Sequence, residues 1–164
     1  MPEPPGDNDA ATRSDLLRHP ETGEEYVFSE QVGHLLRRAY QRNIALFQKF
    51  ATDQQLTSVQ FAVLLALIEA GEGSPTEIGR LTAVDPATMR GIVQRLSKRG
   101  LLTVVADQTD RRKLVLRVTE DGAEIVTRML PGAFEITRRT LEGLNNAEQV
   151  ALLYLLNKLT QDLD

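Results

Sequence analysis

The apolar residues of this chain recur mostly three or four positions apart, the spacing of one side of an α-helix. Residues 29 to about 51 follow this pattern, and Ser29 is a candidate N-cap for the helix they predict. Thr57 precedes a second helix, residues 58–70, which is apolar almost all round and ends at Gly71. A helix without a polar face is buried on most sides, so this segment is expected in the core.

Two helices with explicit start signals come next. Residues 74–77 read S-P-T-E, a capping box with proline at the first helical position, and residues 85–86 read D-P, which repeats the cap and the proline. The second helix, residues 86–99, ends at Gly100, a residue suited to a helix C-terminus. Its apolar side consists of Met89, Ile92, Val93 and Leu96. Two helices joined by a turn of three to four residues form a helix-turn-helix.

Two β-type runs follow this pair of helices. Residues 101–106 and 113–118 flank a polar loop, residues 107–112, that has a basic tip. In the second run Leu114, Leu116 and Val118 alternate with Lys113, Val115 and Arg117. A hairpin directly after the second helix of a helix-turn-helix is a wing.

The C-terminal third of the chain is helical by the same criteria. A long helix is expected over residues 120–144, and the Pro-Gly pair at 131–132 should kink or split it. Asn145 and Glu148 form another capping box, which begins a last helix that runs to about residue 162. The predicted fold class is therefore mainly α (α+β), a winged helix-turn-helix between N-terminal and C-terminal helices.

Charge is distributed unevenly along the chain. The net charge is −4, yet residues 86–118 hold eight basic and only two acidic residues, a net +6, while the remainder carries −10. A basic block on an acidic body is typical of a surface that meets phosphate. The alternative is a solvated helix face followed by a charged loop.

Other function classes lack their characteristic residues. The chain has no Cys and only two His, His19 and His34, so disulfide scaffolds, thiolate zinc sites and thiol nucleophiles are excluded. The Gly71 to Gly73 segment follows no strand and lacks a third glycine, so it is not a dinucleotide fingerprint. We predict no catalytic residue, metal or cofactor. With no long apolar span and no signal peptide, the expected location is the cytoplasm.

Three short motifs carry a family resemblance. Residues 95–101 read R-L-S-K-R-G-L, residues 110–113 read D-R-R-K, and residues 118–122 read V-T-E-D-G. In order and spacing they resemble the R-L-x-x-x-G-L, D-x-R-x and L-T-x-x-G pattern of the MarR family of winged-helix transcription regulators. The resemblance covers residues 29 to 162. One departure is the run Thr103, Val104 and Val105, where many members carry Arg or Lys, so a phosphate contact from this strand is in doubt.

The resemblance implies a homodimer that binds a palindromic operator in double-stranded DNA. It divides the chain into a flexible arm (residues 1–28), a dimerisation helix (29–56), the winged helix-turn-helix (57–118) and C-terminal dimerisation helices (119–164). The helix at residues 86–99 would enter the major groove, and Arg112 at the wing tip would reach the minor groove. Asp110 would brace the wing by orienting neighbouring guanidinium groups.

The residues themselves suggest how DNA would be contacted. Arg90 and Gln94 are four apart and share a helix face, with Thr88 near the N-terminal end where base contacts are usual. Arg95, Lys98 and Arg99 are phosphate candidates, although Arg95 could instead pair with an acid of the protein. The remaining candidates are the wing residues Arg111, Arg112 and Lys113.

An effector site is a further expectation, because family members often respond to small aromatic acids or phenols. His34 and Arg38 are four apart and could hold a carboxylate, with Tyr40 and Phe61 as aromatic walls. The alternative is that His34 is an interface residue and Arg38 is solvated. Residues 34–40 also resemble regulators of nicotinate and related aromatic-acid catabolism.

Two rival functions are an enzyme and a winged helix that contacts only proteins, without effector control. A winged helix that contacts only proteins would lack basic residues on both the second helix and the wing tip.

Overall fold

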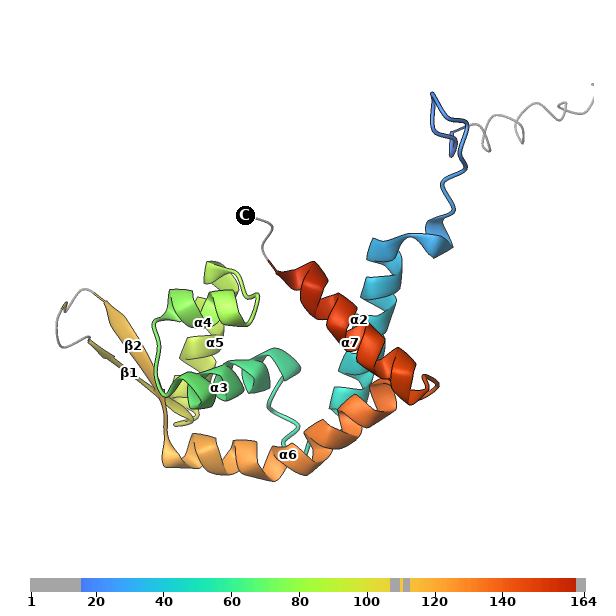
Figure 1. The fold of residues 1–164 in the computed structure, drawn as a ribbon. Coiled ribbons are helices and arrows are strands. Elements are labelled where there is room, and N and C mark those ends of the chain that lie inside the picture. The colour runs from blue at the N-terminus through green and yellow to red at the C-terminus, as the bar shows by residue number, and fades with distance from the viewer. Residues whose placement is uncertain (1–15, 107–109, 111–112, 162–164) are drawn as a thin grey trace, which may run out of the picture. The chain divides into compact units, whose positions relative to one another are not determined.

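The computed structural model describes residues 16–106, 110 and 113–161. The element order agrees with the sequence pattern, and the fold is the expected mainly helical one with a two-stranded antiparallel sheet (Figure 1). The elements are η1 (Phe28–Glu30), α2 (Val32–Phe50), α3 (Ser58–Ala70), α4 (Pro75–Leu81), α5 (Pro86–Lys98), β1 (Leu102–Ala106), β2 (Leu114–Val118), α6 (Glu120–Thr140) and α7 (Asn146–Thr160). None of the helices in these described ranges combines the length and apolar content that a membrane span requires.

The chain divides into two compact units after Gln41, inside α2. The hydrophobic core belongs to the second unit and is built from α3, α4, α5, the hairpin and α6. Its fully buried side chains include Leu64, Leu67, Ile78, Met89, Ile92, Leu96, Leu116 and Met129. The helix predicted to lack a polar face, α3, supplies the centre of this core, as expected.

Four helices begin at the caps that the sequence predicts. Thr57, Ser74 and Asn145 each form a complete capping box, and Asp85 accepts hydrogen bonds from the backbone N–H groups of Ala87 and Thr88. Ser29 is the exception. It lies within the 3-10 turn η1, and α2 begins three residues later at Val32, so its prediction as an N-cap is wrong.

The hairpin is anchored at its base. Its strands pair in the register Leu102 with Val118, Val104 with Leu116 and Ala106 with Leu114. Gly73, just before α4, exchanges two backbone hydrogen bonds with Leu116, at 2.9 and 3.3 Å. The wing strands are thereby joined to the start of the helix-turn-helix.

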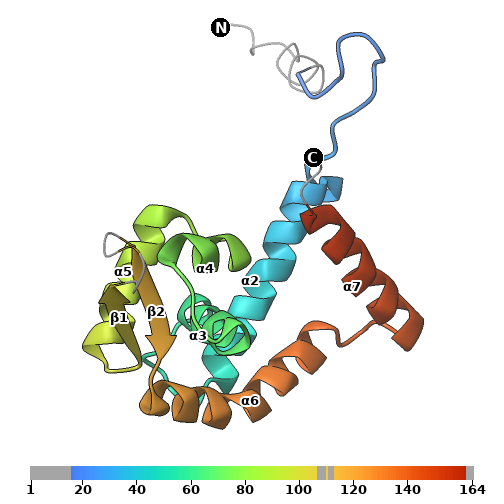
Figure 2. The ribbon, with the colours of Figure 1, turned by 60° about the vertical axis from the view of Figure 1, so that its left-hand side comes forward.

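Helix α6 continues through Pro131 and does not split, and its axis bends near its middle (Figures 1 and 2). Close packing next to this proline depends on Gly132, since a Cβ there would lie 2.5 Å from the carbonyl oxygen of Phe50. Near the end of α6, Arg42 donates to the carbonyl of Arg139 at 3.0 Å and Asn43 donates to Thr140 at 3.0 Å. The C-terminal half of α2 is thus fixed along α6.

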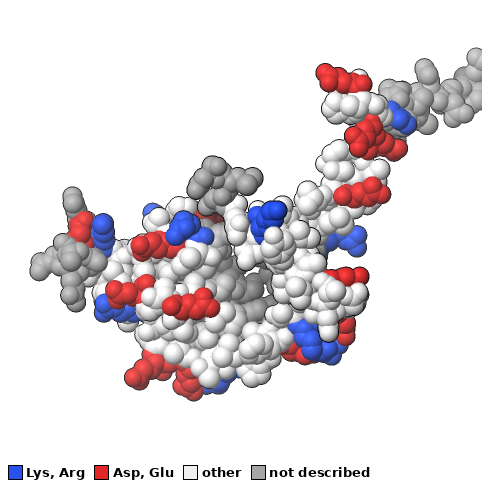
Figure 3. Space-filling view, viewed as in Figure 1, with Lys and Arg blue, Asp and Glu red and all other residues white. Residues whose placement is uncertain are grey.

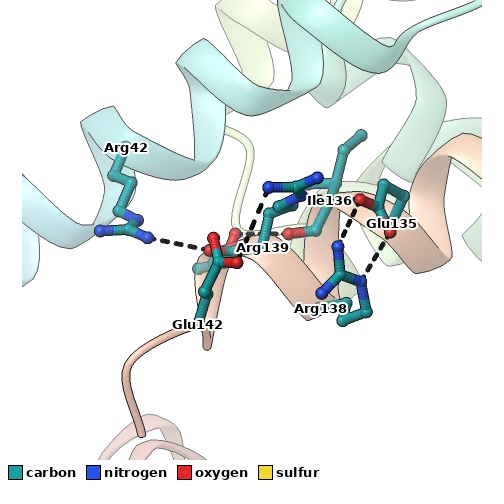
Figure 4. A network of polar contacts seen from close by, with 7 residues as sticks. Arg42, Glu135, Ile136, Arg138, Arg139 and Glu142 are labelled. Carbon is teal, nitrogen blue, oxygen red and sulfur yellow. Dashed lines mark hydrogen bonds and ion pairs between the residues drawn. The ribbon is translucent and has the colours of Figure 1, made fainter.

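A cluster of charges stands beside these contacts (Figure 4). Glu135 accepts hydrogen bonds at 2.7 Å from both Arg138 and Arg139. These hydrogen bonds lower the pKa of Glu135 to about 2, and the bond from Arg138 has a larger effect than the bond from Arg139. The carboxylate is therefore ionised at neutral pH and offsets the positive charges of Arg138 and Arg139.

Candidate nucleic-acid interface

The polar side of α5 faces outward. Met89, Ile92 and Leu96 are buried and fix the orientation of the helix, so the opposite side of the helix points to solvent. The predicted contact residues of this helix, all exposed, are Thr88, Arg90, Gln94, Arg95 and Lys98. The structure therefore brings together one outward row of groups of the type that contact base edges and phosphates.

The N-terminus of α5 is held by Asp85. One of its carboxylate oxygens accepts the N–H groups of Ala87 and Thr88, both at 3.0 Å. Hydrogen bonds from the side chain and the backbone of Thr88 lower the pKa of Asp85, so the cap is charged at neutral pH. Thr88 is thus already tied to the cap at the end of α5 where base contacts are expected.

Arg95 lies along the surface of its own helix. A Cβ added at position 91 would lie 3.3 Å from the guanidinium group of Arg95, which shows that this group lies over Gly91. Within the described ranges Arg95 takes part in no ion pair, and the alternative that it pairs with an acid finds no support there. Its assignment as a phosphate contact stays a prediction.

Arg99 does not belong to this outward row. Its side chain is 25% exposed and forms an ion pair with Asp53, in the loop between α2 and α3. Arg117, counted in the basic block, likewise pairs with Glu72 at 2.6 Å. Because these acids lie 46 and 45 residues away in the chain, no sequence signal indicated either pair. Arg99 is thus engaged by an acid of the protein, and its assignment as a phosphate contact stays a prediction.

The wing is described only in part. Lys113 is exposed at the start of β2, and its N–H donates to the carbonyl of Asp110 at 2.8 Å. Asp110 is partly buried, and its predicted bracing role stays a prediction. Arg111 and Arg112 lie outside the described residues, so their contacts with DNA also remain predictions.

Charge does not gather by sign on the face shown in Figure 3. Basic and acidic side chains are interspersed there, with uncharged surface between them.

An apolar hollow of about 590 Å³ lies between α4, α5 and the start of β2. Its lining includes Pro75, Val84, Val93 and the side chains of Arg80 and Arg90. Arg90 thus connects this hollow with the outward row of α5.

The four predicted effector residues have different surroundings. The ring of His34 contacts that of Phe28 at a tilt of 48°, with centroids 4.2 Å apart, and Arg38 and Tyr40 are exposed on α2. Phe61 is only 6% exposed and packs against Phe47 at 5.9 Å in the core. Its ring packs within the core, and the roles of Phe61 and Tyr40 as aromatic walls stay predictions.

Known proteins resemble this chain over most of its length. A model of the MarR family matches residues 54–113. The HTH-type transcriptional repressor NicR of Pseudomonas putida is 50% identical over 134 residues, which cover 82% of this chain and 85% of NicR.

Two solved structures share the fold. BpsR from Bordetella bronchiseptica, whose DNA binding is regulated by 6-hydroxynicotinic acid, has 50% identity and a TM-score of 0.80, and the match covers 85% of this chain and 99% of BpsR. PcaV from Streptomyces coelicolor, solved with its natural ligand, has 29% identity and a TM-score of 0.76, over 81% of this chain and 94% of PcaV. Together with the outward polar face of α5, these similarities show that the chain belongs to the MarR family and is a DNA-binding transcription regulator, not an enzyme.

Proposed function

We propose that this protein is a homodimeric repressor that binds a palindromic operator in the cytoplasm and releases it on binding a small aromatic carboxylate. The observation that carries the DNA-binding part is the exposed row on α5, with Arg90 and Gln94 outward while Met89 and Ile92 hold the helix in the core. The name of NicR and the regulation of BpsR by 6-hydroxynicotinic acid support repression and release.

The chemistry of the row suits the major groove. Arg90 is able to donate two hydrogen bonds to a guanine, and Gln94 to bond an adenine edge, one helical turn further along α5. Arg95 and Lys98 would contact phosphates, which position the helix but carry no sequence information. A twofold partner would place a second copy of α5 about 34 Å away, one turn of DNA along the same face.

The wing is expected to add charge contacts. Arg112, with Arg111 and Lys113, would reach the backbone or the minor groove next to each half-site. Operator affinity should therefore fall steeply with salt concentration, and Arg112→Ala should reduce the slope of log affinity against log salt by about one to two for the dimer. Arg128→Ala is the matched control, because Arg128 lies on α6 and pairs with Glu124 at 3.1 Å.

A gel-shift or fluorescence titration with DNA from upstream of the gene measures both quantities. Salt-independent binding would exclude the basic block as the interface, and equal slopes for Arg112→Ala and the wild type would exclude a phosphate contact from Arg112. Association with proteins but with no duplex would instead favour the protein-contact function.

Release by a carboxylate would need cations near an aromatic surface. His34 and Arg38 on α2 supply the cationic and hydrogen-bonding groups, and Tyr40 offers an exposed ring. We expect 6-hydroxynicotinic or nicotinic acid to displace operator DNA, while nicotinamide, which lacks the carboxylate, does not. Arg38→Ala should weaken this response without changing operator affinity. If no aromatic carboxylate displaces the DNA, effector control by this class of ligand is wrong.

A further inference from the structure

The end of α5 is a junction between the base-contacting helix and the wing. Arg99 caps the helix, with its N–H donating to the carbonyls of Arg95 and Ser97, and Gly100 follows in a left-handed conformation with φ of 72°. Strand β1 begins two residues later at Leu102. A side chain that fixes Arg99 therefore fixes the end of α5 and the start of the wing together.

Arg99 is held by one carboxylate from a distant loop. Its Nη2 donates to Oδ2 of Asp53, while its Nη1 is buried and has no hydrogen-bond partner among the described residues. The guanidinium group is thus largely withdrawn from solvent at a position where its neighbours Lys98 and Arg95 are exposed. Arg99 is therefore oriented toward Asp53 within the protein, and not outward with the exposed basic residues.

The loop that carries Asp53 is itself rigidly supported. The other oxygen of Asp53 accepts the N–H of Gln55 at 2.8 Å, and the Asp53 carbonyl accepts the N–H of Leu56. Ala51 and Leu56, on either side, are buried in the core, and the Thr52 N–H points to the sulfur of Met129 in α6 at 3.3 Å. Both oxygens of Asp53 are therefore engaged, one by the loop and one by the end of α5.

From these contacts we infer that Asp53 is a positioning residue for DNA binding: through Arg99 it ties the C-terminal end of α5 to the α2–α3 loop and so sets the tilt of the base-contacting row. The inference rests on the proposed function. It assigns to Asp53 a role that involves no contact with DNA.

The geometry shows why such a tie affects base contacts. At 1.5 Å per residue, the 13 residues of α5 span about 20 Å, so a change of tilt of about 10° at one end moves the other end by about 3 Å. Hydrogen bonds to base edges do not survive a shift of that size. Contacts between phosphates and flexible Lys or Arg side chains largely survive such a shift.

The test compares Asp53→Asn with the wild type on two DNA duplexes. One is the tightest binder that the wild type selects from a randomised pool, and the other is an unrelated duplex of equal length. We expect Asp53→Asn to lose about ten-fold or more in affinity for the selected duplex, the size of one lost base contact. Binding to the unrelated duplex and the salt slope should stay unchanged.

Two further variants separate positioning from charge. Glu72→Gln removes the acid that pairs with Arg117 and changes the net charge equally, and it should leave the selectivity intact. The reciprocal variant D53R/R99D restores an ion pair with its charges exchanged, and it should recover most of the lost affinity. Circular dichroism and sedimentation confirm beforehand that each variant is folded and has the same oligomeric state as the wild type.

The contrary outcomes are distinct. Equal affinity of Asp53→Asn and the wild type for the selected duplex overturns the inference, as does a folded D53R/R99D variant that recovers nothing. Tighter binding by Asp53→Asn with a steeper salt slope also overturns it, because Asp53 would then withhold Arg99 from a phosphate. If the wild type selects no duplex at all, the proposed function fails instead.

Discussion

Single residues explain the spacing of Thr119 and Gly122 in the V-T-E-D-G motif at residues 118–122. Thr119 caps α6 by accepting the Gly122 N–H at 3.1 Å, and its hydroxyl donates to the carbonyl of Gly100 at 2.6 Å. A Cβ at position 122 would lie 2.1 Å from the carbonyl oxygen of Leu101. The Thr and the Gly of this motif therefore join α6 to the chain segment that leaves α5.

Gly122→Ala is expected to destabilise the protein by about 2 kcal/mol or more, because the backbone of residue 101 has to move to admit a methyl group. Gly33→Ala is the matched control on another helix, since a Cβ there meets nothing within 4 Å. That change should be neutral or stabilise by up to about 1 kcal/mol, because alanine restricts the unfolded chain. Urea unfolding measures both, and equal stabilities of the two variants would contradict the packing argument.

At the scale of elements, the features that could be predicted from the sequence are those formed by residues close together in the chain. The caps at Thr57, Ser74, Asp85 and Asn145 all form, because each involves atoms within about three residues of chain. The Asp53–Arg99 pair was not foreseeable, since only folding brings these two residues together.

The errors at this scale also have physical causes. Ser29 satisfies the composition rule for an N-cap, but a separate 3-10 turn occupies its position before α2 starts. Leu114 alternates in step with the buried Leu116 yet is 48% exposed, because the end of the hairpin extends past the core that buries Leu116. Alternation predicts which residues share a face, but it does not predict how far the core reaches along that face.

The cap of α3 offers a stability test at the element scale. The Thr57 hydroxyl accepts the Gln60 N–H at 3.2 Å, and the Gln60 side chain, in a buried residue, accepts the Thr57 N–H at 3.0 Å. Thr57→Ala should cost about 1 kcal/mol of unfolding free energy, while Thr57→Ser keeps the acceptor and should cost much less. If both variants lose the same amount in thermal unfolding, the contribution is from the methyl group and not from the cap.

The ion pair at the end of α5 predicts a particular pH dependence. Burial acts to raise the pKa of Asp53, but hydrogen bonds from Arg99 and Gln55 and the charges of Arg99 and Arg128 outweigh it and hold the pKa below its ordinary value of 3.8. A carboxylate with a depressed folded-state pKa stabilises the fold above its unfolded-state pKa, and this stabilisation is lost as pH falls through the folded value.

The stability difference between the wild type and Asp53→Asn should therefore be constant from pH 7 to about 5 and shrink in more acidic solution. Urea unfolding of both proteins at each pH provides the comparison. A difference that instead grows as the pH falls would mean that Asp53 carries a raised pKa, and the ion pair would not be its dominant interaction.

At the scale of the whole molecule, many large apolar side chains of the described residues are exposed. No residue of α7 is buried, and its exposed side chains include Val150, Leu153, Tyr154, Leu155 and Leu159. A helix with this many exposed apolar side chains is typical of an interaction site. A second copy of the chain is the partner that the homodimer proposal requires, and the family resemblance implies that α7 is one of the dimerisation helices.

The double variant V150E/L159E tests this assignment. Both side chains are about 70% exposed in the single chain, at 70% and 68%, so the substitution disturbs little within one subunit. In a dimer each buried apolar side chain of this size contributes about 1.5–3 kcal/mol, and a buried unpaired carboxylate adds a large penalty. Sedimentation should therefore show monomers that remain helical by circular dichroism.

Thr127→Glu, which adds a charge at an exposed position of α6, should leave the dimer intact. The proposed dimer would also determine how DNA is bound, since a monomer presents one copy of α5 and reaches one half-site. V150E/L159E should thus lose affinity for a duplex with two half-sites far more than for one with a single half-site. A folded variant that still sediments as a dimer would move the interface away from α7, while a monomer with unchanged affinity for the palindrome would separate dimerisation from operator binding.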